Sequence, residues 1–140
     1  MPKGRYKKAP SPATSGKHHL YLNAKPPGEL VGTVAKLRWK NTIHTLASEN
    51  RKLPKSHEGI LIGFCSSFQL LADCEASIRT DGLLVDGGRD GKRRSPALAG
   101  KIQALNAIRQ FSAELGLSPA SASRLPLPPI EEERNEFADL

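Results

Sequence analysis

Apolar residues recur at intervals of three and four along two long segments, 56–80 and 96–115. This spacing places the apolar side chains of each segment on one face of an α-helix. Between the two segments lies a turn-rich stretch with four glycines from position 82 to position 91, followed by the cations Lys92–Arg94. That stretch is typical of a small β-hairpin. The pattern therefore predicts a mainly α fold built on a long antiparallel helix pair joined by a β-hairpin.

Shorter signals complete the expected organisation. Apolar spacing predicts an N-terminal helix over 28–48, with Leu30, Val31, Val34, Leu37, Ile43 and Leu46 on its apolar face. Ser95-Pro96 has the form of a helix start, Gly116 of a helix end, and 118–124 of a short C-terminal helix. We expect a disordered basic arm at 1–27, a helical core and oligomerisation domain at 28–125, and a Pro-rich, acidic tail at 126–140.

Several classes of function find no support in the sequence. The chain has no Ser-His-Asp elbow, no phosphate-binding glycine loop followed by Lys-Ser/Thr, and no zinc spacing. Cys65 and Cys74 fall on one predicted helix, roughly 13 Å apart, so they are expected to be free thiols. We therefore expect no enzyme activity, no cofactor and no metal. No run of eighteen apolar residues occurs and no apolar segment follows the basic start, so we expect no membrane-spanning helix and no secretory signal.

Charge is distributed very unevenly along the chain. Residues 1–55 carry a net charge of +10, residues 56–129 carry +1 and residues 130–140 carry −4. A strongly basic end suits a polyanion, because each cation near a phosphate releases condensed counterions. The arm is therefore either a nucleic-acid-binding segment or a solubility tail. Its candidate DNA-binding residues are Lys3, Arg5, Lys7, Lys8 and Lys17.

Two further groups of cations fall on segments that are expected to fold. Lys36 and Lys40 share one face of the first helix, whereas Arg38 points away from them. Lys92, Arg93 and Arg94 are consecutive on the return strand of the hairpin. Each group is either a phosphate-binding surface or a solvated surface. For the hairpin group, contact with an acidic partner is a further possibility. Trp39, between these cations, is expected in a core or interface.

The two long helices can bury only part of their apolar surface area against each other. Self-association would bury the remainder. The candidate oligomerisation residues are Ile60, Phe64, Phe68, Leu71, Leu98, Ile102, Leu105 and Ile108. In the acidic tail, Glu131, Glu132, Glu133 and Phe137 are candidates for binding a protein partner.

The order and spacing of six short motifs resemble the large family of phage terminase small subunits that lacks a lambda-type helix-turn-helix. The resemblance covers about two thirds of the chain, from Gly28 to Leu125. The motifs are Trp39, Leu53-Pro54, Phe64-Cys65, Gly82-Leu83-Leu84-Val85, Ser95-Pro96-Ala97-Leu98 and the block from Glu114 to Arg124.

The resemblance implies a non-catalytic subunit that forms a homo-oligomeric ring. Such a subunit binds double-stranded viral DNA at the packaging start region and regulates a large terminase subunit, which holds the ATPase and nuclease. The portal protein is a further partner to consider, and the expected location is the host cytoplasm, with no membrane partner. Two alternatives stay open: a small basic DNA-binding regulator that acts as a dimer, and a structural phage assembly protein.

Overall fold

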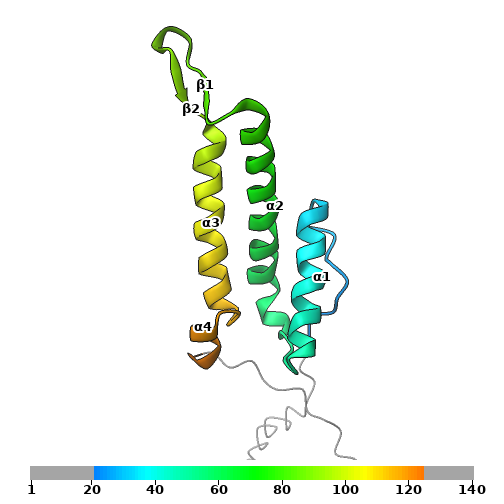
Figure 1. The fold of residues 1–140 in the computed structure, drawn as a ribbon. Coiled ribbons are helices and arrows are strands. Elements are labelled where there is room, and N and C mark those ends of the chain that lie inside the picture. The colour runs from blue at the N-terminus through cyan, green and yellow to red at the C-terminus, as the bar shows by residue number, and fades with distance from the viewer. Residues whose placement is uncertain (1–20, 125–140) are drawn as a thin grey trace, which may run out of the picture.

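The computed structural model describes residues 21–124, which are mainly helical, as the sequence predicts. Two 3-10 turns, Lys55–His57 and Gly88–Asp90, lie between the longer elements. In chain order the elements are α1 (Thr33–Ser48), α2 (Glu58–Asp81), β1 (Leu84–Asp86), β2 (Lys92–Arg94), α3 (Pro96–Glu114) and α4 (Pro119–Arg124) (Figure 1). The antiparallel pair of α2 and α3, joined by a two-stranded hairpin, confirms the predicted arrangement.

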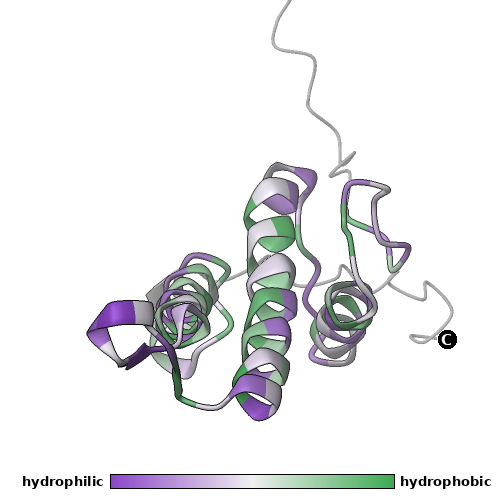
Figure 2. Ribbon diagram, turned by 90° about the horizontal axis from the view of Figure 1, so that it is seen from above, coloured by the Kyte–Doolittle hydropathy of each residue, from purple (hydrophilic) through white to green (hydrophobic). Residues whose placement is uncertain are grey.

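Seen from above, α2 lies between α1 and α3 (Figure 2). Glycines bring α2 and α3 close together. A Cβ atom on Gly63 would lie 2.8 Å from Cζ of Phe111, and one on Gly100 would lie 2.8 Å from Sγ of Cys74. A larger residue at either position would therefore force the facing side chain, the Phe111 ring or the Cys74 thiol, to move.

The largest buried side chains lie where α1 covers the first half of α2. Trp39 and Leu46 of α1 and Leu61 of α2 are almost fully buried, and Leu30 and Leu53 join them from the flanking loops. Trp39 is therefore a core residue, as predicted. Cys65 is buried in the same cluster, and it and Cys74 are free thiols, which confirms that prediction.

The start of the first helix differs from the sequence expectation. The chain makes a turn in which the amide of Leu30 donates to the carbonyl of Pro27 at 3.1 Å, and α1 begins only at Thr33. Gly32 has a φ of 98°, a conformation that favours glycine and separates the turn from the helix. Val31 therefore precedes the helix and is 78% exposed. Leu37 lies within α1 but on the side opposite the buried Trp39, and it is 59% exposed. The prediction that both lie on the buried face is wrong.

The segment from Tyr21 to Pro27, expected to belong to a disordered arm, packs on the helices. The amide of Leu22 donates to the carbonyl of Leu53 at 3.0 Å, and the Leu22 side chain is buried. Nε1 of Trp39 donates to the carbonyl of Asn23, also at 3.0 Å. A buried indole N–H needs such an acceptor, so the packed part of the chain starts near residue 21.

Two helices end in the same way. After α1, Asn50 has a φ of 60°, and the amide of Arg51 donates to the carbonyl of Leu46 at 2.7 Å. After α3, Gly116 has a φ of 68°, and the amide of Leu117 donates to the carbonyl of Ser112 at 3.0 Å. This left-handed residue followed by a backward hydrogen bond satisfies carbonyls that the helix itself leaves open. The predicted end at Gly116 is confirmed.

At the start of α3, Oγ of Ser95 accepts from the amide of Ala97 at 3.3 Å, and Pro96 is the first helical residue. The predicted cap is thus confirmed.

By length and composition, one stretch of 18 residues within Lys55–Asp81 is apolar enough to cross a membrane. The core helix of a folded protein passes the same test, so this finding does not overturn the expectation of no membrane-spanning helix. The contacts of α2 with α1 and α3 give its apolar side chains a different use, namely packing between two helices.

Candidate nucleic-acid interface

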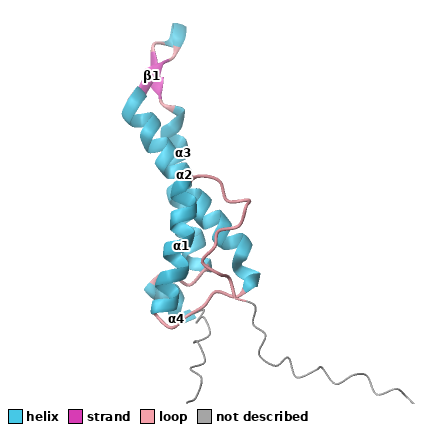
Figure 3. Cartoon of the chain, turned by 90° about the vertical axis from the view of Figure 1, so that its right-hand side faces the viewer, coloured by secondary structure: helices cyan, strands magenta, loops and turns pink. Residues whose placement is uncertain are grey.

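The hairpin of β1 and β2 projects beyond the paired ends of α2 and α3 (Figures 1 and 3). Its register pairs Leu84 with Arg94, Val85 with Arg93 and Asp86 with Lys92. Two backbone hydrogen bonds hold the hairpin. At its base the amide of Ser95 donates to the carbonyl of Leu83 at 2.8 Å, and near its tip the amide of Gly87 donates to the carbonyl of Gly91 at 2.6 Å. A short sequence of turn residues therefore holds three cations away from the helices.

Every cation of this hairpin is exposed. Lys92, Arg93 and Arg94 alternate along β2, so Arg93 points to one side of the ribbon and its two neighbours to the other. Arg89, in the turn, adds a fourth exposed cation, which is not among the residues predicted from the sequence. The sequence feature that could have identified Arg89 is its position between Gly88 and Gly91, at the tip of the hairpin.

None of these four cations has an acid partner within the part of the chain that the structure describes. The ion pairs between residues 21 and 124 are Arg51 with Glu49 at 3.5 Å and Lys101 with Glu75 at 3.3 Å. Asp86 accepts a hydrogen bond from the amide of Gly88 at 2.9 Å instead of pairing with Lys92. The hairpin is thus a concentrated positive charge available to an anion.

A second basic surface lies on the outer side of α1. Lys36 and Lys40 share an exposed face, as predicted, and His44 continues it one turn further. Together with Lys25, from the loop before α1, they line a groove of about 690 Å³. Lys25 and His44 were not predicted from the sequence, because only the fold brings the loop onto this face.

The two basic surfaces are separate. The hairpin lies at the far end of the α2–α3 pair, whereas α1 lies beside the opposite half of α2 (Figure 1). DNA that contacts both surfaces must therefore extend along the molecule or contact different copies of it.

The remaining predicted contacts lie outside the described residues. They are the arm cations Lys3, Arg5, Lys7, Lys8 and Lys17, and the tail residues Glu131, Glu132, Glu133 and Phe137.

The eight candidate oligomerisation residues divide into three groups by exposure. Phe64 is only 5% exposed and fills the subunit's own core. Ile60, Phe68, Leu71, Leu98 and Ile108 are half-buried, and Ile102 and Leu105 are exposed by 53% and 46%. The surface available to a partner is therefore centred on α3 and the adjoining edge of α2.

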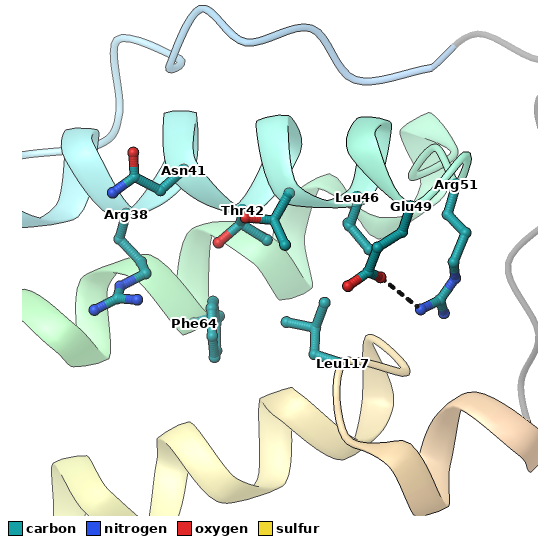
Figure 4. A pocket seen from close by; sticks show the side chains of 9 residues that line it. Arg38, Asn41, Thr42, Leu46, Glu49, Arg51, Phe64 and Leu117 are labelled. Carbon is teal, nitrogen blue, oxygen red and sulfur yellow. Dashed lines mark ion pairs between the residues drawn. The ribbon is translucent and has the colours of Figure 1, made fainter.

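A smaller groove of about 220 Å³ lies between α1 and the end of α3 (Figure 4). Phe64 and Leu117 form its apolar floor, and Arg38 and Arg51 lie at its ends. The guanidinium carbon of Arg38 lies 3.9 Å from the centre of the Phe68 ring, pointing away from Lys36 and Lys40, as predicted. Burial raises the pKa of the nearby Cys65 thiol to about 12, so this thiol is not a nucleophile at neutral pH.

No group of three or more potential metal ligands occurs among residues 21–124.

Comparison with known proteins adds one finding. The profile of the family described as "phage terminase, small subunit" matches residues 35–132, which is more than half of the chain. No curated protein and no solved structure matches.

Proposed function

The chain belongs to the phage terminase small subunit family, and from that premise we propose that it binds viral DNA at the packaging start region and recruits and regulates the large subunit. The large subunit, an ATPase and nuclease, would then drive the genome into procapsids. In this proposal the chain is a regulatory, non-catalytic subunit that acts in the host cytoplasm.

The observation that carries the DNA-binding part is the set of four unpaired cations on the projecting hairpin, Arg89 and Lys92–Arg94, none of which has an acid partner among residues 21–124. Exposed cations of this kind release counterions when they meet phosphates, and this release supplies affinity that does not depend on base sequence. The groove of Lys25, Lys36, Lys40 and His44 supports the same ligand. The basic residues of the arm would add further contacts.

Self-assembly into a ring is the second part of the proposal. Ile102 and Leu105 are exposed three positions apart on α3, so they form adjacent apolar surface that a neighbouring copy would cover. A ring also repeats each hairpin and each arm, so that contacts that are weak singly gain strength through multivalency.

Protein partners are the third part. We assign the binding of the large subunit, and as a second candidate the portal protein, to the acidic tail with Glu131–Glu133 and Phe137. Opposite charge at the two ends of the chain lets the tail bind protein while the basic surfaces bind DNA.

DNA binding is tested by fluorescence anisotropy with a labelled duplex over a range of salt concentrations. The variant Lys92→Ala/Arg93→Ala/Arg94→Ala should bind more weakly and with a shallower dependence of log affinity on log salt, by roughly 0.9 for each phosphate that is no longer neutralised. The control Lys55→Ala/Arg79→Ala removes two exposed cations outside both basic surfaces and should retain the original slope.

Light scattering separates the proposal from its two alternatives. A ring-sized assembly that binds DNA supports a terminase subunit. A dimer that binds DNA favours a small regulator, and an assembly that binds no DNA favours a structural assembly protein.

A further inference from the structure

Arg38 occupies a position that one copy of the chain leaves incomplete. It is half-buried and stacks on Phe68 at 3.9 Å, yet it forms no ion pair with any acid among the described residues. Stacking on an aromatic ring holds the guanidinium plane in place while its N–H groups stay open to a further partner. A fixed, partly desolvated guanidinium is suited to a carboxylate from outside the subunit.

Helical spacing places rows of apolar side chains from α2 and α3 on the same side of the molecule as Arg38. On α2, Phe68, Leu71 and Glu75 follow one another at intervals of three and four. On α3, Lys101 and Leu105 do the same, and the ion pair between Glu75 and Lys101 joins the two rows. Ile108, three positions after Leu105, extends the α3 row and packs against the hydrophobic core. We name this surface, formed by Arg38, Phe68, Leu71, Leu105 and Ile108, the Arg38 face.

The opposite side of α2 has the complementary character. Leu70 and Asp73 are three positions apart and lie away from the row of Phe68, and both are exposed. Oδ1 of Asp73 accepts from Nε2 of Gln69 at 2.9 Å, while Oε1 of Gln69 accepts from the amide of Val34 at 3.0 Å. The carboxylate of Asp73 is thus held in place without a cation partner among residues 21–124. We name this surface, formed by Leu70 and Asp73, the Asp73 face.

We propose that the Arg38 face of one copy packs on the Asp73 face of the next, with Arg38 of the first copy paired to Asp73 of the second. This deepens the proposed assembly by naming the two surfaces that meet. The Arg38 face meeting its own copy would offer Arg38 only Glu75 and Glu49, which already pair with Lys101 and Arg51. The contact is therefore between unlike surfaces. Contacts of this kind repeat from copy to copy and close into a ring when the rotation allows, whereas like surfaces stop at a dimer.

Charge exchange tests the pairing. By light scattering, Arg38→Glu and Asp73→Arg should each weaken assembly by about 30-fold or more in dissociation constant, because each leaves like charges facing one another. The double variant Arg38→Glu/Asp73→Arg should recover most of the loss. Lys55→Glu makes the same charge change at an exposed position before α2, outside both faces, and should assemble like the unaltered chain. Circular dichroism identifies any variant that loses helix.

A cross-linking experiment gives an answer that does not depend on stability. Chains with Arg38→Cys mixed with chains with Asp73→Cys should form disulfide-linked pairs under mild oxidation, and neither variant should do so alone. Pairs formed by Arg38→Cys alone would overturn the proposal in favour of contact between like surfaces. Full assembly by both single charge variants, with no cross-linking of the mixture, would also overturn it. Either result would contradict the pairing of the two faces but not the proposed ring. If the unaltered chain is a monomer, the proposed assembly itself is wrong.

Discussion

The guanidinium of Arg51 donates a hydrogen bond of 3.1 Å to the main-chain carbonyl of Gly116, and so joins the loop after α1 to the end of α3. The two residues are 65 positions apart in the sequence. Arg51 also pairs with Glu49 at 3.5 Å. This bond links the two outer helices, which otherwise meet mainly through α2.

Replacing Arg51 with Ala should therefore destabilise the subunit. The change removes the donor to a buried glycine's carbonyl, a loss of about 1–3 kcal/mol in the free energy of unfolding. Urea unfolding followed by circular dichroism measures it. Lys55→Ala, which removes a nearby exposed cation, serves as the control, and an equal loss in both variants would show that the bond is unimportant.

The two left-handed helix ends should respond differently to alanine and glycine. Gly116→Ala should cost about 1–2 kcal/mol, because an alanine Cβ clashes at a φ of 68°. Asn50→Gly should be neutral or slightly stabilising, since glycine adopts a φ of 60° freely. Thermal unfolding at equal chain concentration measures both. If Gly116→Ala melts with the unaltered chain, the positive φ at this position is not required.

The buried thiol of Cys65 predicts a specific pH dependence. Its pKa is raised from 9.0 to about 12 by burial, with the Arg38 charge acting in the opposite direction. The unfolded chain therefore ionises first as pH rises. The stability that Cys65 contributes is complete below pH 9 and is lost as pH rises toward 12. The difference in unfolding free energy between the unaltered chain and Cys65→Ala should shrink over this range, and a constant difference would contradict the prediction.

Deletion of the arm should weaken DNA binding and reduce its salt dependence. The structure places the cut after residue 20, because Leu22 and Asn23 pack on the helical core. The slope of log affinity against log salt should fall by roughly 0.9 for each phosphate that the arm neutralises. Unchanged affinity and slope would make the arm a solubility tail and leave DNA binding to the hairpin and α1.

Deletion of residues 130–140 should reduce the stimulation of the large subunit's ATPase, because it removes five acids and Phe137 from the proposed docking segment. Light scattering of the same variant checks that assembly persists. Stimulation equal to that of the full chain would move the docking site to the folded part of the subunit.

Local signals in the sequence predicted the helix pair, the hairpin and the ends at Ser95 and Gly116. Each depends on a few neighbouring residues, such as the Ser-Pro start of α3, whose conformational preferences agree with the fold. Val31 was placed wrongly because the turn at Pro27 and the positive φ of Gly32 delay the helix by five residues relative to the apolar pattern. Leu37 was placed wrongly because it lies on the side of α1 opposite the buried Trp39.

Contacts between distant segments could not be predicted in this way. The bond from Trp39 to Asn23, the stacking of Arg38 on Phe68 and the groove between Lys25 and Lys40 all join segments whose approach depends on the packing of the helices. The pattern of charge showed that basic surfaces exist, and the fold shows where two of them lie.

The helix α2 has two neighbours along its first half and one along its second. Its contact with the start of α1 ends near Gln69, and α2 continues for twelve more residues, roughly 18 Å, beside α3 alone. Amides near Leu61 then exchange with solvent only when the core opens, whereas those near Ile78 exchange through local fraying that costs much less free energy. One continuous helix thus joins a slowly opening base to a readily opening end, and the end that opens first is the one that carries the hairpin.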